Sequence, residues 1–123
     1  MDFTIAFLFF MRDEVPVAGI REWLEMLLGR RVGLRVEGNS MEPTLKSGDR
    51  VLVDPKAPIR PGDIVLTDHP FKSSIRLIKR LVSIEADGRI FLAGDNAAES
   101  SDSRIFGVIS RKHLVGKVVS RMR

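Results

Sequence analysis

Apolar and polar residues alternate in short runs through most of the chain from residue 32 onward. In residues 32–37, Val32, Leu34 and Val36 fall on one side of an extended chain, which predicts a strand with one buried face. Many short strands joined by Gly-Asp turns predict a mainly β domain, an antiparallel barrel or sandwich-like fold. Further strands are expected at residues 50–54, 63–67, 74–85, 89–93, 105–109 and 114–120.

The N-terminal part of the chain has a different pattern. Residues 3–11 are apolar, but nine residues rise only about 14 Å as a helix, against about 30 Å for a hydrocarbon core. We therefore expect no full transmembrane helix, and no secretory signal, because no basic residue precedes the segment. Whether the chain begins at Met1 or at Met11 stays open. Residues 17–28 then carry Ile20, Trp23, Leu24, Leu27 and Leu28 at helical spacing, which predicts an N-terminal amphipathic helix.

Two interpretations of this helix are open. It docks on its own domain, or residues 3–28 make a peripheral contact with a membrane interface, helped by Trp23 and the basic pair Arg30-Arg31. On either interpretation the chain divides into an N-terminal segment, residues 1–31, and a β domain, residues 32–123. No second globular domain or low-complexity segment is expected within 123 residues.

Composition removes several functional classes. Cysteine is absent, which excludes disulfides, cysteine nucleophiles and thiolate metal sites. The two histidines, His69 and His113, are isolated, so we expect no metal site and no cofactor. The net charge of +4 would suit an acidic partner, but no helix-turn-helix or aromatic RNA-binding pattern accompanies it, and we expect no nucleic acid partner.

Lys79 is the first candidate for chemistry. In the expected strand RLIKRLV its same-face neighbours are Leu77 and Leu81, while Arg76 and Arg80 point to the other side. Burial among leucines disfavours the charged ammonium and lowers a lysine pKa, which would let the amine act as a base. The alternative is an edge-strand lysine that discourages aggregation.

Two loops offer partners for such a base. In GNSMEPTL, residues 38–45, a turn presents the Ser40 hydroxyl and leaves its backbone N–H free to face an oxyanion. In GDNAAESSDSR, residues 94–104, Asp102 and Arg104 are spaced for a salt bridge, and Ser100 can hydrogen-bond a neutral lysine amine. Taken singly, the first is also consistent with an ordinary turn serine and the second with a polar surface loop.

Together these three segments resemble the type I signal peptidase family, over most of residues 34–119. The resemblance implies a signal-peptidase-like catalytic domain in which Ser40 is the nucleophile and Lys79 the general base. It further implies that Ser100 orients the lysine and that Asp102 and Arg104 hold the loop in shape. The residues implied to contact substrate are Val36, Gly38, Met41, Leu45 and Ile78. Gly38 stands where some members have a serine, so that second oxyanion donor is missing.

The chain also departs from typical signal peptidases. No full transmembrane helix precedes Ser40, and only residues 85–89 join the lysine strand to the next one. This compact form, with His69-Pro70 ahead of the lysine, resembles the maturation proteases of nickel-type superoxide dismutase. The resemblance implies removal of an N-terminal leader peptide from a precursor protein by a cytoplasmic or peripherally membrane-associated enzyme.

Three other functions remain open at this stage. A LexA-type self-cleaving regulator also uses serine and lysine. A non-enzymatic basic β module would bind nucleic acid or a membrane and would be indifferent to Ser40. A conventional Ser–His–Asp hydrolase would use His69 as its base.

Overall fold

A computed structural model describes residues 15–122, so the apolar residues 3–11 lie outside the described part. Its core is one six-stranded sheet in which every neighbouring pair of strands is antiparallel, in the order β1-β2-β6-β3-β4-β5. The expected mainly β fold with an N-terminal helix is confirmed. The strands are β1 (Val32–Arg35), β2 (Arg50–Asp54), β3 (Ile64–Asp68), β4 (Arg76–Ile84), β5 (Ile90–Ala93) and β6 (Leu114–Met122). The helices are α2 (Ile20–Leu27) and α3 (Ser103–Phe106), with two 3₁₀ turns, η1 (Ala97–Glu99) and η2 (Arg111–His113).

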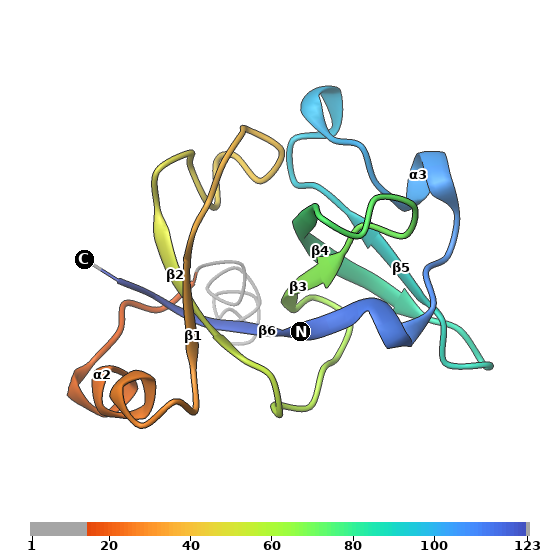
Figure 1. Cartoon of the computed structure of the whole chain (residues 1–123). Coiled ribbons are helices and arrows are strands. Elements are labelled where there is room, and N and C mark those ends of the chain that lie inside the picture. The colour runs from red at the N-terminus through yellow and green to blue at the C-terminus, as the bar shows by residue number, and fades with distance from the viewer. Residues whose placement is uncertain (1–14, 123) are drawn as a thin grey trace, which may run out of the picture.

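Strand β6 bends the sheet into a half-barrel. Its first residues pair with β3 and its later residues with β2, so it joins the two wings of the sheet (Figure 1). Gly116 lies where β6 crosses the end of β2, and a Cβ there would come within 2.7 Å of the Asp54 carbonyl oxygen. A glycine permits this close backbone approach. The bend places β1 and β2 opposite β3, β4 and β5.

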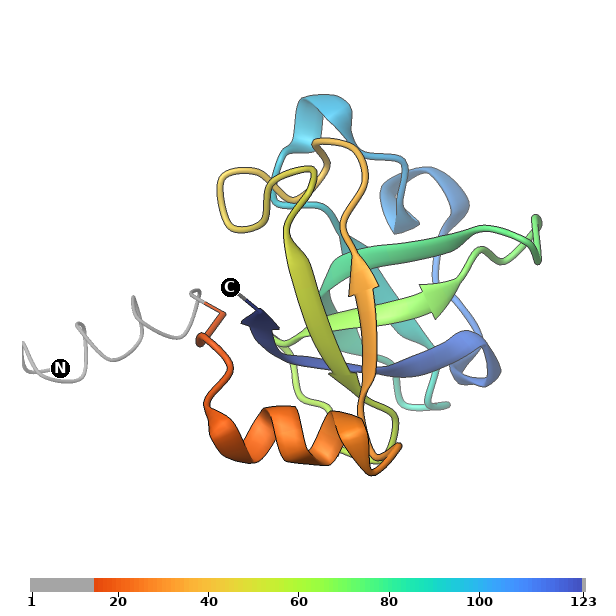
Figure 2. The same cartoon turned by 60° about the vertical axis from the view of Figure 1, so that its left-hand side comes forward.

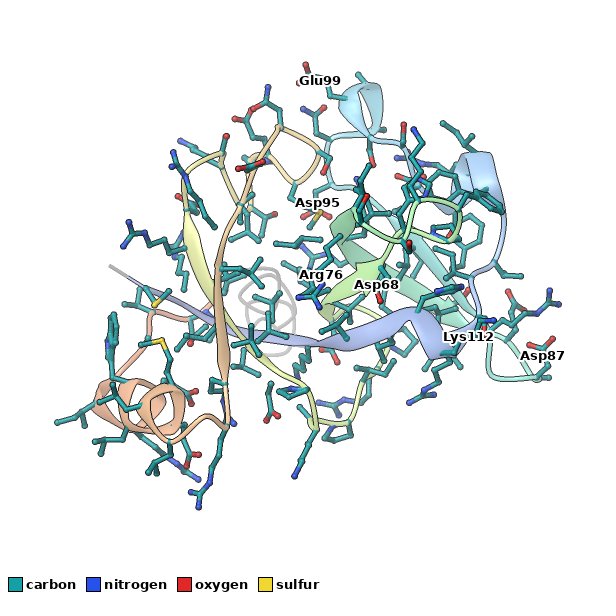
Figure 3. The ribbon with its side chains drawn as sticks, viewed as in Figure 1. Asp68, Arg76, Asp87, Asp95, Glu99 and Lys112 are labelled. Atoms are coloured by element: carbon teal, nitrogen blue, oxygen red, sulfur yellow. The ribbon has the colours of Figure 1, made fainter. Side chains whose placement is uncertain are left out.

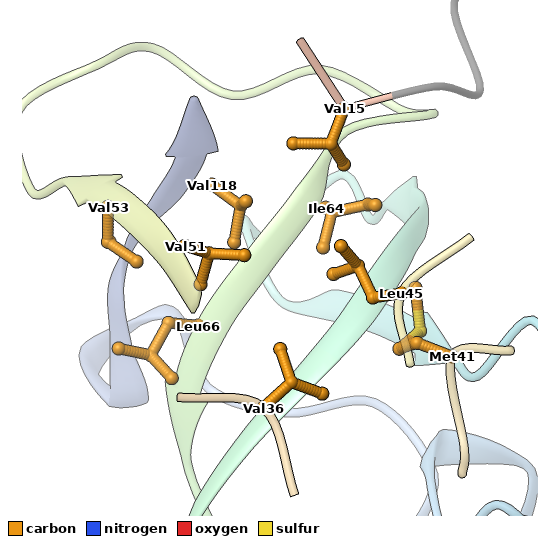
Figure 4. Packing of buried hydrophobic residues seen from close by; sticks show 9 residues of the cluster. All are labelled: Val15, Val36, Met41, Leu45, Val51, Val53, Ile64, Leu66 and Val118. Atoms are coloured by element: carbon orange, nitrogen blue, oxygen red, sulfur yellow. The ribbon is translucent and has the colours of Figure 1, made fainter. Parts of the chain in front are cut away.

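The two faces of the sheet bury separate apolar clusters, as the alternation of β3 requires. Ile64 and Leu66 point into the first cluster and Val65 into the second. The first cluster is shown in Figure 4 and contains Val15, Val36, Met41, Leu45, Val51, Val53, Ile64, Leu66 and Val118. The second contains Ile59, Val65, Leu81, Ile90, Leu92 and Ile109.

One predicted strand is wrong. Residues 105–109 do not form a strand, because the helical turn α3 occupies Ser103–Phe106 and only Ile109 makes an isolated bridge, to Ile90. The Asp102 side chain accepts a hydrogen bond from the Arg104 backbone N–H, which starts the turn. Gly107, with φ of 77°, ends it. The local capping signals therefore outweigh the apolar spacing.

Helix α2 lies beside β1, on the outer side of the sheet (Figures 1 and 2). No residue of α2 is buried, and its contact with the sheet includes Met26, whose Sδ lies 3.4 Å from the position that a Cβ on Gly33 would occupy. Most of its apolar side chains face away from the sheet. Among residues 15–122, no helix is both long and apolar enough to cross a bilayer.

Candidate active site

Ser40 lies in the turn that follows β1. Gly38, with φ of 81°, lets the chain leave the strand sharply, and the peptide bond between Glu42 and Pro43 is cis. The Ser40 side chain is half-buried. Within residues 15–122, neither its hydroxyl nor its backbone N–H donates a hydrogen bond to the protein. Both groups are therefore available to a bound molecule.

Lys79 is buried near the middle of strand β4. It is 4% exposed, it pairs with Val65 across β3 and β4, and the fully buried Leu81 follows it on the same face. Its Nζ donates a hydrogen bond to Ser100 Oγ at 3.0 Å. Burial lowers the pKa of Lys79, against the opposing charge of Asp102 and with a smaller contribution from Arg104. The amine is thus biased toward its neutral, basic form.

Ser100 connects this lysine to a buried carboxylate. Its hydroxyl donates to Asp102 Oδ2 at 2.5 Å, so the Ser100 oxygen is left to accept from Lys79. Arg104 pairs with both oxygens of Asp102, at 2.9 Å from Nε and 2.6 Å from Nη2, and the Gly94 N–H adds a bond at 2.8 Å. Burial acts to raise the pKa of Asp102, but these hydrogen bonds outweigh it and hold that pKa well below its usual range. Asp102 stays ionised and fixes the direction of the Ser100 hydroxyl.

One cavity contains both the serine and the lysine. It has a volume of about 510 Å³, and its walls come from the segment around Ser40 and from the first half of β4. Of the residues that the resemblance assigned to substrate contact, Val36, Gly38, Met41 and Ile78 line it. Leu45 does not line it, because this side chain is fully buried in the first core cluster.

The segment 94–96 holds the Ser40 turn in place. The Asn96 backbone N–H donates to the Ser40 carbonyl oxygen at 2.8 Å, and the Asn96 side-chain amide donates to the Asn39 carbonyl oxygen at 3.0 Å. Gly94 packs directly against the same backbone. Gly94 and Asn96 belong to the GDNAAESSDSR motif, which predicted no role for them. The Gly-Asp-Asn triplet is the signal of this contact in the sequence.

Asp95 forms hydrogen bonds that link the Ser40 turn to strand β4. It accepts from Arg80 Nη2 at 2.6 Å and from Thr44 Oγ1 at 2.5 Å, and Figure 3 shows it between the loop after β1 and strand β4. Arg80 also donates to the Gly62 carbonyl oxygen at 2.8 Å. Because Arg80 points away from Lys79, it supports the turn without placing its charge beside the amine.

His69 is separated from Ser40. It does not line the cavity, its Nδ1 accepts from the backbone N–H groups of Phe71 and Lys72, and its ring packs 5.1 Å from that of Phe106. Because Nδ1 accepts these backbone hydrogen bonds, the imidazole stabilises the loop between β3 and β4. This geometry disfavours the Ser–His–Asp alternative.

Comparison with known proteins agrees with the arrangement of this site. Residues 21–119 match a family model described as Peptidase S24-like, which covers more than half of the chain. The chain therefore belongs to that family, and its class is that of a serine peptidase.

The curated relatives are more specific. The chain is 30% identical to mitochondrial inner membrane protease subunit 1 of Xenopus tropicalis, over 69% of this chain and 65% of that protein. It is 31% identical to the protein of the same name from Schizosaccharomyces pombe, over 69% of each chain. A probable signal peptidase I-1 from Synechocystis is 22% identical over 91% of this chain and 82% of the relative. The chain spans about two thirds of the length of the mitochondrial relatives that it matches.

Proposed function

We propose that this chain is a serine endopeptidase in which Ser40 attacks a peptide bond and Lys79 is the general base. The observation that carries the proposal is that Ser40 and Lys79 line the same cavity, while the Lys79 amine is hydrogen-bonded to Ser100. The Lys79 amine bonds to Ser100, and its hydrogen bond to Ser40 forms when substrate displaces water from the cavity. Such catalytic hydrogen bonds are often long in unliganded sites.

The first half of the reaction forms an ester. Lys79 Nζ takes the proton from Ser40 Oγ as that oxygen bonds to the scissile carbonyl carbon, and the carbonyl electrons move onto the oxyanion. The free N–H of Ser40 stabilises this charge. The ammonium of Lys79 then gives its proton to the leaving amine, the carbon–nitrogen bond breaks, and the acyl group stays on Ser40.

The second half releases the acyl group. A water molecule takes the place of the departed amine, Lys79 removes its proton, and the hydroxide attacks the ester carbon. The ester bond breaks and Ser40 Oγ recovers the proton from Lys79. Ser100 acts as a positioning residue in both halves. Its hydroxyl proton is directed to Asp102, so its oxygen can only accept a hydrogen bond from the Lys79 amine. Neutral lysine keeps its own lone pair for the reacting proton.

The shape of the cavity favours an extended peptide. Strand β1 is an edge strand, and the segment from Leu34 to Met41 faces residues 75–79 across the cavity. A substrate chain between these walls can pair with a strand edge through its main chain. Val36, Met41 and Ile78 line the cavity. We propose that they form shallow apolar sites and that small residues such as alanine precede the bond that is cut.

We further propose that the substrate is a precursor protein with an N-terminal leader peptide, and specifically the leader of a nickel-type superoxide dismutase. Support for the broader statement comes from the relatives, which include a probable signal peptidase. The narrower statement rests on the resemblance of the compact sequence. We also propose peripheral membrane association through residues 3–28, supported in the described part by the outward-facing apolar side chains of α2.

Co-expression with leader-bearing precursors tests the proposal. The wild-type chain is expected to shorten the precursor, while Ser40→Ala and Lys79→Met leave it intact, as read by mass analysis of the precursor N-terminus. His69→Ala is the matched control and should still process it. Processing by Lys79→Met at the wild-type rate would overturn the dyad. Processing of other leaders but not of the superoxide dismutase leader would overturn only the narrower substrate.

A further inference from the structure

A second cavity lies under helix α2, on the other side of β1 from the candidate active site. It has a volume of about 380 Å³, and its lining residues include several apolar side chains and two arginines, Arg35 and Arg50. Its apolar lining comes from Trp23, Met26, Leu34 and Met122, together with the backbone of Gly33. The peptidase mechanism makes no use of this cavity.

The two arginines are placed against each other by the sheet. Arg35 and Arg50 are directly opposite partners in the register of β1 and β2, so their side chains leave the same face of the sheet as neighbours. Like charges in directly opposite positions destabilise a pair of strands. Within residues 15–122, neither side chain has a hydrogen bond or an ion pair, whereas nearby Arg30 and Arg31 are paired with Glu25 and Glu22. The juxtaposition leaves a site for an anion that bridges both groups.

Helix α2 shows what kind of molecule carries that anion. Its apolar stripe faces outward, with Ile20 81% and Leu27 77% exposed, while the acidic Glu22 and Glu25 are half-buried. A contiguous apolar surface of this kind indicates an apolar partner outside the domain. Trp23 belongs both to this stripe and to the lining of the cavity, and tryptophan is enriched at the boundary between headgroups and acyl chains.

We propose that this cavity binds the phosphate group of an anionic phospholipid between Arg35 and Arg50, while α2 lies in the surrounding bilayer interface. Guanidinium groups bind phosphate oxygens with paired hydrogen bonds, and the walls formed by Met26 and Met122 accommodate glycerol and upper acyl carbons. This inference deepens the proposed membrane contact by naming a lipid class and its ligands. It does not depend on peptidase activity.

Arg35 connects the proposed lipid site with the candidate active site. This residue lines both the lipid cavity and the candidate active-site cavity. A lipid bound at Arg35 would therefore place the peptide-binding wall formed by β1 at the membrane surface. Precursors whose leaders emerge at that surface would reach Ser40 without leaving it.

Vesicle binding tests the proposal, with Trp23, the chain's single tryptophan, as the fluorescent reporter. The full chain carrying Ser40→Ala is titrated with vesicles of phosphatidylcholine alone and of phosphatidylcholine with 30 mol% phosphatidylglycerol. Arg50→Gln is expected to weaken binding to the anionic vesicles about fivefold, the effect of one basic residue near an anionic surface, and Arg35→Gln should do the same. Binding to the neutral vesicles should be unchanged in both variants.

Arg111→Gln is the matched charge control. This exposed residue adjoins Lys112, which lies far from α2 in Figure 3. An equal loss from Arg111→Gln would overturn the proposal, since the attraction would then be a diffuse charge effect. Saturation of the Trp23 signal by millimolar inorganic phosphate would also overturn it, in favour of a site for a free anion. A Ser40→Ala chain that binds neither kind of vesicle would overturn the lipid site and leave the peptidase proposal standing.

Peptidase activity provides the independent check on folding. Arg50 does not line the active-site cavity, so Arg50→Gln should cleave a soluble leader peptide at the wild-type rate. Retained cleavage with lost anionic-vesicle binding supports the lipid site. Retained cleavage with unchanged vesicle binding overturns it.

Discussion

The Cα atom of Gly94 lies so close to Ser40 that an added Cβ would stand 2.6 Å from the Ser40 carbonyl oxygen. The same Cβ would also overlap the hydroxyl of Ser100. The absence of a side chain on Gly94 thus lets the Ser40 turn approach both Ser100, which accepts a hydrogen bond from Lys79, and the buried Asp102. A glycine is required here because of close packing between backbones, rather than because of an unusual φ angle.

Gly94→Ala should therefore disturb the site from its centre. Either the Ser40 turn or the Ser100 loop has to move by several tenths of an ångström or more. A misplacement of about 1 Å costs about 100-fold in rate when it separates reacting groups. We expect cleavage of a leader peptide to fall by that order, with a loss of thermal stability. Gly19→Ala is the control, because a Cβ there meets nothing within 4 Å. Wild-type cleavage by Gly94→Ala would show that the two loops adjust independently.

The loss of the Ser100 hydroxyl should affect chemistry more than binding. Ser100 joins Lys79 to Asp102, and it does not line the candidate active-site cavity. Ser100→Ala is expected to lower kcat about 10- to 100-fold while KM changes little, because it misplaces a base that contributes about 10²- to 10⁴-fold without removing it. Steady-state kinetics and the pH profile of kcat/KM provide the measurement. A rise in KM at constant kcat would instead assign Ser100 to substrate binding.

The strands of this protein were predictable because they alternate or form apolar runs with clear turn signals. Strand β2 was predicted with its observed bounds, and β3, β4 and β5 within one or two residues. The segment after Ser103 was not, because its apolar spacing fits a short strand as well as a helical turn. Only the capping by Asp102 and Gly107 distinguishes the two, and this signal was present in the sequence.

The site was less predictable from the residues alone. Alternation indicated that Lys79 has apolar neighbours, but no local pattern states that Ser40 and Lys79 line one cavity or that Ser100 bonds to Lys79. That relationship came from the family resemblance. The supporting contacts of Asn96 and Asp95 were not predicted, because hydrogen bonds from one loop to the backbone of another leave no periodic trace in a sequence.

The Asp102 carboxylate should make the free energy of unfolding depend on pH in the acidic range. The pKa of Asp102 is lowered in the folded protein. The carboxylate therefore makes its full contribution to the free energy of unfolding above the unfolded-state pKa, near 3.9, and this contribution is lost as the pH falls below that pKa. Asp102→Asn should lower the free energy of unfolding at pH 7 by about 2 kcal/mol, because it weakens the bonds from Arg104 and Ser100 inside the protein. The wild type should lose this advantage between pH 4 and pH 2, as followed by urea unfolding. Asp87→Asn, on an exposed turn, is the control and should leave stability nearly unchanged over the same pH range.

The Asn96 side chain should matter through the backbone it holds. Its amide donates to the Asn39 carbonyl oxygen, next to the proposed nucleophile Ser40. Asn96→Ala therefore removes a hydrogen bond worth about 1 kcal/mol and loosens the Ser40 turn. We expect a decrease in kcat of about tenfold with only a small change in melting temperature. Thr44→Val, which loses the bond to Asp95 at the other end of the turn, offers a comparison. Equal effects on kcat from both would mean that the whole turn, rather than its first residues, positions the serine.

Lys79 should reduce stability at neutral pH, and this cost can be measured separately from activity. Burial lowers the pKa of its amine in the folded protein, so between that value and about 10.4 the unfolded chain binds more protons than the folded one. Across this window the free energy of unfolding rises with pH, by at most about 1.4 kcal/mol per unit. Lys79→Met removes the titrating group, and it should be more stable than the wild type at neutral pH but lack this rise. Unfolding by urea from pH 6 to pH 10 measures both slopes, with Lys112→Met as an exposed control. Parallel slopes for the wild type and Lys79→Met would mean that the amine keeps an ordinary pKa, and would remove the physical basis for lysine as the base.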